Sequence, residues 1–166
     1  MIGRLLTAGM IVLAAGAAQA DERAFLGSLE GQWAGRGMVK MRADARPINV
    51  SCNFDTQSAG SALSMRGTCR GLVVVSRSIG ADLQSNGENY RGIYTGPMGG
   101  RSGLVGKRRG DAINLTVRWA KEVNGDHRAN MTLRKVGENG MRLTTIDVDP
   151  SSGKRVVTSD INLQRR

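Results

Sequence analysis

The sequence has few of the residues from which catalytic and nucleic-acid-binding sites are built. One of its 166 residues is histidine, and tryptophan, tyrosine and phenylalanine together make up only 4%. So few aromatic side chains argue against nucleic acid as a partner, because single strands are held by stacking their bases on aromatic rings. The glycine-rich stretch 96–103 lacks the lysine spacing and the following helix of a phosphate loop. With no serine elbow and no cluster of metal ligands, the sequence predicts a non-catalytic protein without a metal or cofactor.

Long hydrophobic runs are also missing, except at the start of the chain. Arg4 precedes an apolar segment over residues 5–15, and Ala18-Gln19-Ala20 has the small-x-small pattern of a cleavage site. This order is typical of a secretory signal peptide, and the apolar segment is too short for a membrane anchor in the mature protein. We therefore predict a signal peptide over 1–20, one mature domain over 21–166, no transmembrane anchor, and a periplasmic or secreted location.

The chain has only two cysteines, Cys52 and Cys69, a number that fits an oxidising compartment. Each lies on a strand-like segment, and a turn at 59–62 separates the two segments. Pairing the segments around this turn places the cysteines directly opposite each other on the inward face. Because C-x-x-C spacing is absent, we predict a structural disulfide rather than a redox pair.

Basic residues outnumber acidic ones, 24 to 14, and the formal net charge is +10. Outside the cytoplasm, the matching polyanions are lipopolysaccharide, anionic lipid headgroups and acidic polysaccharides. A basic patch is predicted from Lys107, Arg108, Arg109 and Arg118, with Arg101 and Arg134 nearby. The other interpretation of these cations is an ordinary solvated surface.

Alternation with a period of two dominates the chain from residue 32 onwards. The clearest strand is 112–119, where every second residue is apolar: Ile113, Leu115, Val117 and Trp119. Short turns separate eight to ten such strands, and no helical crossover lies between them. We predict an all-β fold, an antiparallel up-and-down barrel plugged at one end by a short helix within 21–30. A two-sheet sandwich is the alternative.

Three local features carry predictions of their own. The run Leu72-Val73-Val74-Val75 is expected to be buried on both faces or covered by the helix. In strand 141–148 the apolar positions change parity, which predicts a bulge near Thr144-Thr145 with Ile146 and Val148 inward. Val157 is expected to point inward from the last strand.

The beginning of the domain carries a recognisable pattern. Phe25-Leu26 is followed by Gly31-x-Trp33-x-Gly35-x-Gly37. The inward Gly35 and Gly37 suit a position where the sheet bends sharply or another group approaches the backbone. The pattern resembles the first strand of calycin barrels, which include lipocalins, fatty-acid-binding proteins and nitrobindin-like proteins. In lipocalins, an arginine near the chain end packs over this tryptophan. The resemblance implies that Arg165 or Arg166 does so here.

The resemblance also implies a ligand inside the barrel, close to Trp33, Gly35, Gly37, Trp119 and His127. Nitrobindin-like proteins bind haem through one histidine late in the chain, and His127 is expected opposite Trp119 in the simplest hairpin register. An imidazole there could ligate iron. The other interpretation of His127 is a half-exposed turn residue, because it follows Asn124-Gly125-Asp126.

Two functions are consistent with these patterns. The first is a non-catalytic carrier that holds a small apolar or amphipathic ligand inside the barrel, with the inward glycines leaving room for it. The second is an envelope-surface protein with a packed barrel, whose basic outer face binds anionic lipid, lipopolysaccharide or polysaccharide. Strand number and the size of inward residues decide between a filled and a hollow barrel.

Overall fold

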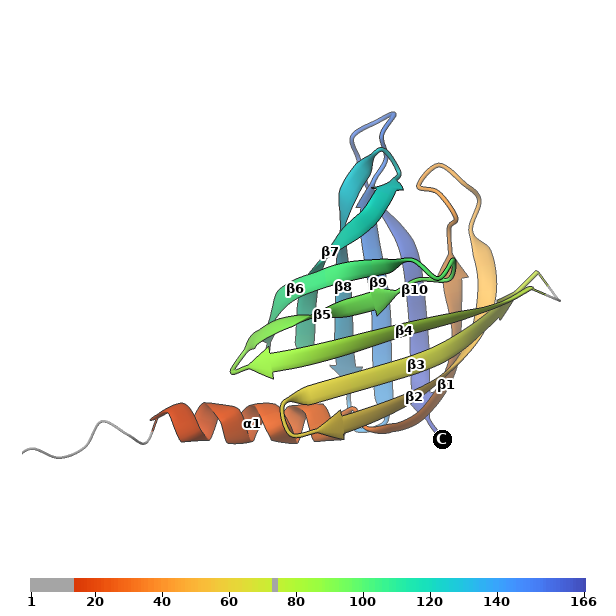
Figure 1. The fold of residues 1–166 in the computed structure, drawn as a ribbon. Helices are drawn as coiled ribbons and strands as arrows, with labels where there is room; N and C mark the ends of the chain where they lie inside the picture. Colours follow the sequence, from red (N-terminus) through yellow and green to blue (C-terminus); the bar gives the residue numbers. More distant parts are fainter. Residues whose placement is uncertain (1–13, 73–74) are drawn as a thin grey trace, which may run out of the picture.

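A computed structural model describes residues 14–72 and 75–166 of the chain, with the side chains from residue 19 onwards. It contains one helix followed by ten strands (Figure 1). The helix is α1 (Ala14–Ser28). The strands are β1 (Gly31–Val39), β2 (Ile48–Ala59), β3 (Ala62–Gly71), β4 (Val75–Asn86), β5 (Asn89–Thr95), β6 (Arg101–Arg109), β7 (Ala112–Val123), β8 (Asp126–Val136), β9 (Gly140–Val148) and β10 (Arg155–Arg165).

The strands form a closed antiparallel barrel in chain order. Each strand pairs with its sequence neighbours, and β1 pairs with β10 to complete the ring, with Trp33 opposite Arg165 at one end of this seam. Closure leaves no long edge strand to pair with another chain. The predicted all-β up-and-down barrel of eight to ten strands is confirmed, and the sandwich alternative is not what forms.

The core follows the predicted alternation. In β7, Ile113, Leu115 and Val117 are buried, whereas Asn114 and Arg118 are exposed. Side chains of one parity point into the barrel and those of the other into solvent, as in any half-buried antiparallel strand. The chain's six aromatic residues, Phe25, Trp33, Phe54, Tyr90, Tyr94 and Trp119, all belong to this core or pack against it.

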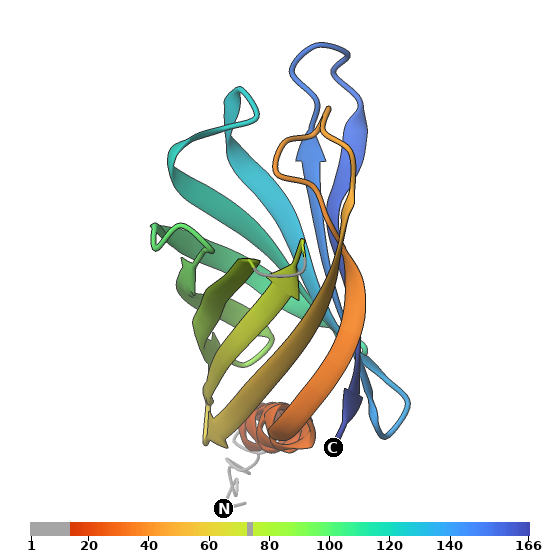
Figure 2. The same cartoon turned by 90° about the vertical axis from the view of Figure 1, so that its right-hand side faces the viewer.

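Helix α1 lies across one end of the barrel, as Figures 1 and 2 show from two directions. Phe25, Leu26 and Leu29 enter the core from the helix and the residue after it. The predicted plug is therefore confirmed, although the helix begins earlier than residue 21. The signal peptide stays a prediction: residues 1–13 lie outside the described residues, and 14–20 belong to α1. Within the described part of the chain, no helix is both long and apolar enough to cross a membrane.

The predicted disulfide is present. Cys52 faces Cys69 across β2 and β3, and their Cα atoms are 4.1 Å apart. Cys52 is buried and Cys69 is half-buried, so the bond lies on the inward face of the wall.

The run at 72–75 is not buried as predicted. Leu72 is 64% exposed and Val75 is 37% exposed, while residues 73 and 74 lie outside the described part. Leu72 directly follows β3 and Val75 begins β4, at the end of the barrel opposite α1, and no other described element covers either side chain there.

The predicted bulge lies on the neighbouring strand. The register shifts in β10 between Val157 and Ser159, so β9 keeps its alternation. Ile146 pairs with Val157 on the outer face, and Val148 is 37% exposed, whereas Asp147 is buried. Burial of Asp147 is possible because Asn124 donates a 2.7 Å hydrogen bond to its carboxylate. The inward placement of Ile146, Val148 and Val157 was therefore wrong.

Candidate functional site

One end of the barrel is sealed around Trp33. The indole Nε1 donates a 3.0 Å hydrogen bond to the carbonyl of Leu29, and only 1% of the residue is exposed. Above the ring lies the Arg165 guanidinium, 4.3 Å from the ring centre, and it donates a 2.8 Å hydrogen bond to the carbonyl of Ser28. The arginine contact that the calycin resemblance implies is thus present, through Arg165.

A buried ionic cluster fastens α1 to the opposite wall. Glu22, 2% exposed, accepts hydrogen bonds from the Tyr90 hydroxyl and, at 2.9 Å, from the Arg108 Nε. Arg108 also pairs with Asp21, and its guanidinium lies 4.8 Å from the centre of the Phe25 ring. Burial, followed by the hydrogen bond to the Glu22 carboxylate, raises the pKa of Tyr90 well above its ordinary value.

The basic patch predicted from Lys107, Arg108, Arg109 and Arg118 does not form, partly because Arg108 belongs to this cluster. Arg108 points inward and is committed to Glu22 and Asp21, so it is not available to a partner. Lys107 and Arg109 are exposed near the α1 end, but Arg118 pairs with Gly103, four positions along β6 from Lys107. The four residues therefore do not form one surface.

The inward glycines do not leave space for a ligand. A Cβ atom on Gly35 would overlap the carbonyl oxygen of Asn162, and one on Gly37 would overlap that of Asp160. Both positions need glycine because β10 crosses β1 too closely for any side chain. The close approach of β10 therefore accounts for both glycines, and Trp33 is almost fully buried.

The other end of the barrel is more open. Several apolar side chains there belong to the inward-facing set and yet are only partly buried. They are Val39, Ile48, Cys69, Ile79, Tyr94 and Trp119. The inward residues nearer α1, such as Leu104, Ile113 and Leu163, are at most 1% exposed. The interior therefore changes from a packed core at the α1 end to an accessible apolar lining, which we call the mouth, at the opposite end.

Tyr94 and Trp119 meet inside the mouth. Their ring centres are 6.0 Å apart and the rings meet edge to face at 66°. Burial raises the pKa of Tyr94 to about 12. The Trp119 Nε1 is out of contact with water and has no hydrogen-bond partner in the described structure. A buried donor without a partner is costly, so this N–H destabilises the mouth end of the core.

Arg77 supplies a cation at the mouth that was not singled out from the sequence. It pairs with Cys69, whose side chain points inward, and it is exposed. Residues directly opposite each other on an antiparallel pair share a face, so Arg77 belongs to the inward set at the rim. The available signal was its parity with Ile79 and Leu83 along β4.

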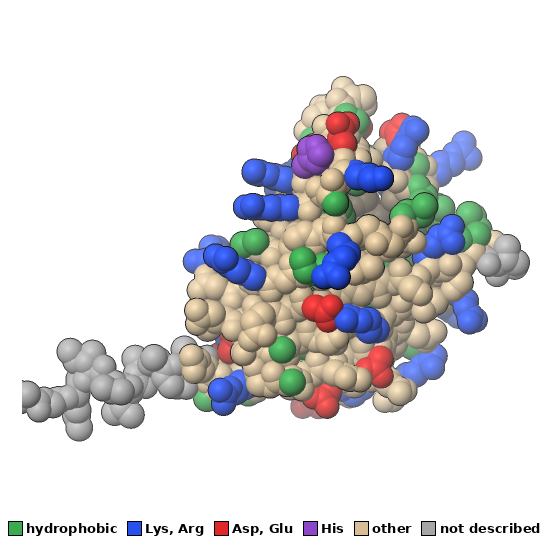
Figure 3. Space-filling view, in the orientation of Figure 1, with side chains coloured by type: hydrophobic (Ala, Val, Ile, Leu, Met, Phe, Trp, Pro, Cys, Tyr) green, Lys and Arg blue, Asp and Glu red, His purple; other side chains and the backbone are tan. Residues whose placement is uncertain are grey.

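His127 does not take the predicted place. The β7–β8 register is regular up to the pair Arg118–Arg128 and is broken before the turn, and His127 is exposed (purple in Figure 3). An axial haem ligand is held against an apolar pocket, so this histidine does not fit haem. Nor do the described residues contain a group of three or more side chains able to hold a metal ion.

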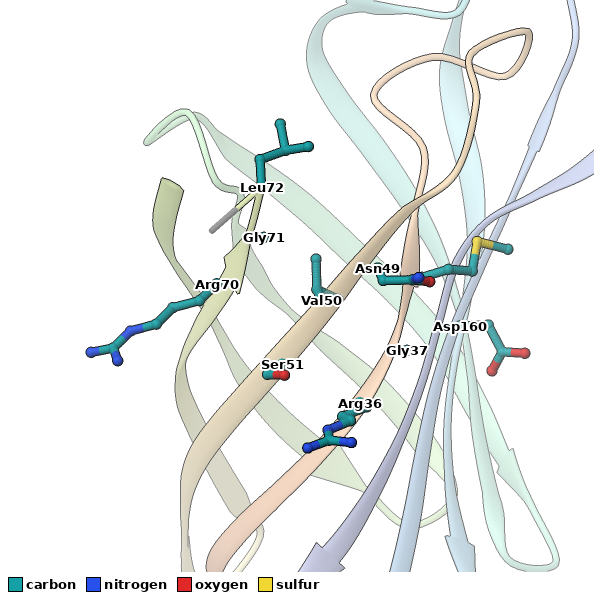
Figure 4. A pocket seen from close by; sticks show the side chains of 10 residues that line it. Arg36, Gly37, Asn49, Val50, Ser51, Arg70, Gly71, Leu72 and Asp160 are labelled. Atoms are coloured by element: carbon teal, nitrogen blue, oxygen red, sulfur yellow. The ribbon is translucent and has the colours of Figure 1, made fainter. Parts of the chain in front are cut away.

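Two hollows are lined mainly by residues of β1, β2 and β3, from both faces of the wall. The first, of about 870 Å³, includes the cross-strand row Arg36–Ser51–Arg70. In Figure 4, Arg70 and Asp160 extend away from each other at its two margins, and Leu72 projects at the end of β3. The second hollow, of about 590 Å³, also includes Arg70. Neither lining includes Tyr94 or Trp119, although the second includes Ile79.

Comparison with known proteins gives a likeness of fold. No family model matches the chain, and no curated protein matches its sequence. The crystal structure of Rv2717c from M. tuberculosis is similar, with a TM-score of 0.67, and the alignment covers 85% of this chain and 94% of that one. The two sequences are 18% identical, so the shared property is the barrel fold.

Proposed function

We propose that this chain is a non-catalytic, calycin-like binding protein that takes a small amphipathic ligand into the mouth of its barrel. The observation that carries the proposal is the accessible apolar lining around Tyr94 and Trp119, above a core that is closed by α1. An inward apolar surface that stays accessible to solvent is stabilised when a ligand covers it.

The mouth also indicates the chemistry of the ligand. Its apolar part would lie against the partly buried side chains of Ile79, Tyr94 and Trp119. Arg77 at the rim favours an anionic group at the outer end of the ligand. The side chains available there bind and orient, and we assign no acid–base pair to them. We also propose export to the periplasm or beyond, which the disulfide and the leader-like pattern support.

Selective fluorescence quenching tests the proposal. The probe is a long-chain carboxylate with bromine on its chain, which quenches an indole that it touches. Trp119 is accessible from the mouth and Trp33 is sealed, so we expect saturable quenching of Trp119 emission alone. Trp119→Phe should abolish the quenching, while Arg77→Gln should weaken binding about tenfold.

The matched control is Arg91→Gln, which removes an exposed arginine from the outer wall. It should leave the affinity unchanged. Unsaturable quenching, or equal quenching in Trp119→Phe, would contradict a binding site in the mouth. Native mass spectrometry of protein from its own source would then show whether a molecule co-purifies.

A further inference from the structure

We infer that the rim of the mouth docks on the surface of an anionic lipid bilayer. The inference concerns the rim and stands whether or not the mouth holds a ligand. Met41 lies between β1 and β2, Leu72 directly follows β3, and Met98 lies between β5 and β6. Because the strands run up and down in chain order, all three residues belong to the end of the barrel opposite α1 (Figure 1).

Each of these three residues exposes a large apolar side chain. Met41 is 62% exposed, Leu72 is 64% exposed and Met98 is 78% exposed. They are the three most exposed large hydrophobic residues among the described side chains, and they come from separate parts of the sequence. Single exposed apolar residues are ordinary, but a group at one end of a molecule marks an interaction surface.

Leu72 is held in an unfavourable backbone conformation. Its φ is 49°, in the left-handed region that glycine and asparagine adopt most easily. A leucine at such a position, pointing into solvent, gains nothing from packing against the rest of the barrel. Insertion into a lipid interface would remove its side chain from water.

Basic side chains surround the apolar ones. The exposed cations on or next to the connections at this end include Arg46, Arg70, Arg101, Lys154 and Arg155. None of these five forms an ion pair with a described residue, whereas two acids of the β1–β2 and β9–β10 connections are engaged. Asp44 pairs with Arg42, and Asp149 accepts hydrogen bonds from Ser151 and Ser152. Figure 3 shows hydrophobic and basic side chains side by side at the upper right of the molecule.

This combination fits a bilayer better than a soluble polyanion. Cations near a membrane attract anionic headgroups, and apolar tips beside them enter the interface. An acidic polysaccharide would be held by the cations and would leave Met41, Leu72 and Met98 in water. Nucleic acid is disfavoured because the aromatic side chains lie in the core or pack against it, so none forms an outer platform for bases.

Vesicle flotation tests the inference on the whole protein. We expect binding to phosphatidylcholine vesicles that contain phosphatidylglycerol, and much weaker binding to phosphatidylcholine alone. The variant Met41→Ser, Leu72→Asn, Met98→Ser should bind the anionic vesicles at least about tenfold less. Asparagine is chosen at 72 because it tolerates the left-handed conformation, and the melting temperature of the variant should match that of the parent.

Matched variants distinguish docking through this rim from non-specific binding through any exposed apolar or basic residue. Val105→Ser with Val136→Ser removes exposed apolar groups, 40% and 50% exposed, away from this rim, and should leave binding unchanged. Arg46→Gln with Arg70→Gln should reduce binding, whereas Lys107→Gln with Arg109→Gln near the α1 end should not. Absence of vesicle binding would overturn the inference. So would binding that the triple variant retains in full, because that result means attraction by charge alone.

Discussion

The guanidinium of Arg165 lies 4.3 Å from the centre of the Trp33 ring and joins the last strand to the first. Trp33 itself hydrogen bonds the carbonyl of Leu29 just after α1, and Arg165 hydrogen bonds that of Ser28 at the helix end. Two side chains therefore hold three elements, α1, β1 and β10, at the place where the barrel closes.

Replacing this arginine tests the seam directly. Arg165→Ala removes the cation from the ring and two hydrogen bonds from the α1 end, so we expect a loss of about 1–3 kcal/mol in the free energy of unfolding. Chemical denaturation measures the loss. Arg166→Ala, a change of the exposed next residue, is the control and should shift stability by less than about 0.5 kcal/mol. Equal effects from the two changes would mean that the stacking does not contribute.

Gly35 is required by the close approach of β10. In Gly35→Ala, the new methyl group would overlap the Asn162 carbonyl, so the seam must open, and we expect a loss of more than about 2 kcal/mol. Gly100→Ala is the matched control, since a Cβ at Gly100 meets nothing within 4 Å. Thermal unfolding of the two variants distinguishes them. A stable Gly35→Ala protein would show that the wall can shift at this point.

The disulfide is expected to stabilise the fold without taking part in function. The cysteines are 17 positions apart, and closing a loop of that length contributes about 3 kcal/mol by restricting the unfolded chain. Cys52→Ser with Cys69→Ser should lower the denaturation midpoint accordingly, while quenching of Trp119 by the brominated probe persists. Thiol titration of the unfolded, unreduced parent should find no free thiol. Two reactive thiols in that titration would exclude the bond.

Titration of Tyr94 is expected to make the free energy of unfolding depend on pH in the alkaline range. Burial raises its pKa to about 12, whereas a tyrosine in the unfolded chain titrates near 10. Above pH 10 the unfolded state therefore loses this proton first, so stability falls as pH rises through the interval from about 10 to about 12. By pH 12 the loss should reach roughly 2 kcal/mol.

Tyr94→Phe removes this contribution. Urea unfolding of the parent and of the variant at pH 8 and at pH 11 gives the difference, and absorbance at 295 nm follows phenolate formation directly. Tyr90 stays in both proteins and cancels from the comparison. An identical pH dependence in parent and variant would mean that the Tyr94 hydroxyl is solvated.

The barrel could be predicted from the sequence because the patterns that specify its strands and turns each lie within a short segment of the chain. Alternation in segments such as 112–119 reports which side of a strand is buried, and the turn at 59–62 is sufficient to bring Cys52 opposite Cys69. Side chains that depend on distant partners could not be placed in this way. Arg108 follows Lys107 in a basic run, and only Glu22, 86 residues away, makes it an inward anchor. Asp147 is buried because Asn124 reaches it from the β7–β8 turn.

Only part of the mouth could be predicted from the sequence. The parity of Tyr94 and Trp119 could be read from the strands that carry them, but their contact depends on the curvature of β5, β6 and β7. For Gly35 and Gly37, the sequence allowed a bend in the sheet, a close approach to the backbone or room for a ligand. Only the structure shows that the β10 backbone makes the close approach. Leu72 was predicted to be buried because it begins an apolar run. Only the fold shows that no described element covers its side chain.

The pairing of β1 with β10 has a consequence for biosynthesis. The first strand, β1, cannot complete its pairing until the last strand, β10, has been synthesised. Trp33 and Arg165, which pair across these two strands, are 132 positions apart in the sequence. The hairpin that carries the two cysteines can form earlier, because its contacts are local. A chain interrupted before β10 would keep two unpaired strand edges, β1 and β9, which are templates for aggregation. Synthesis of β10 is thus the step that pairs the two open strand edges and closes the barrel against aggregation.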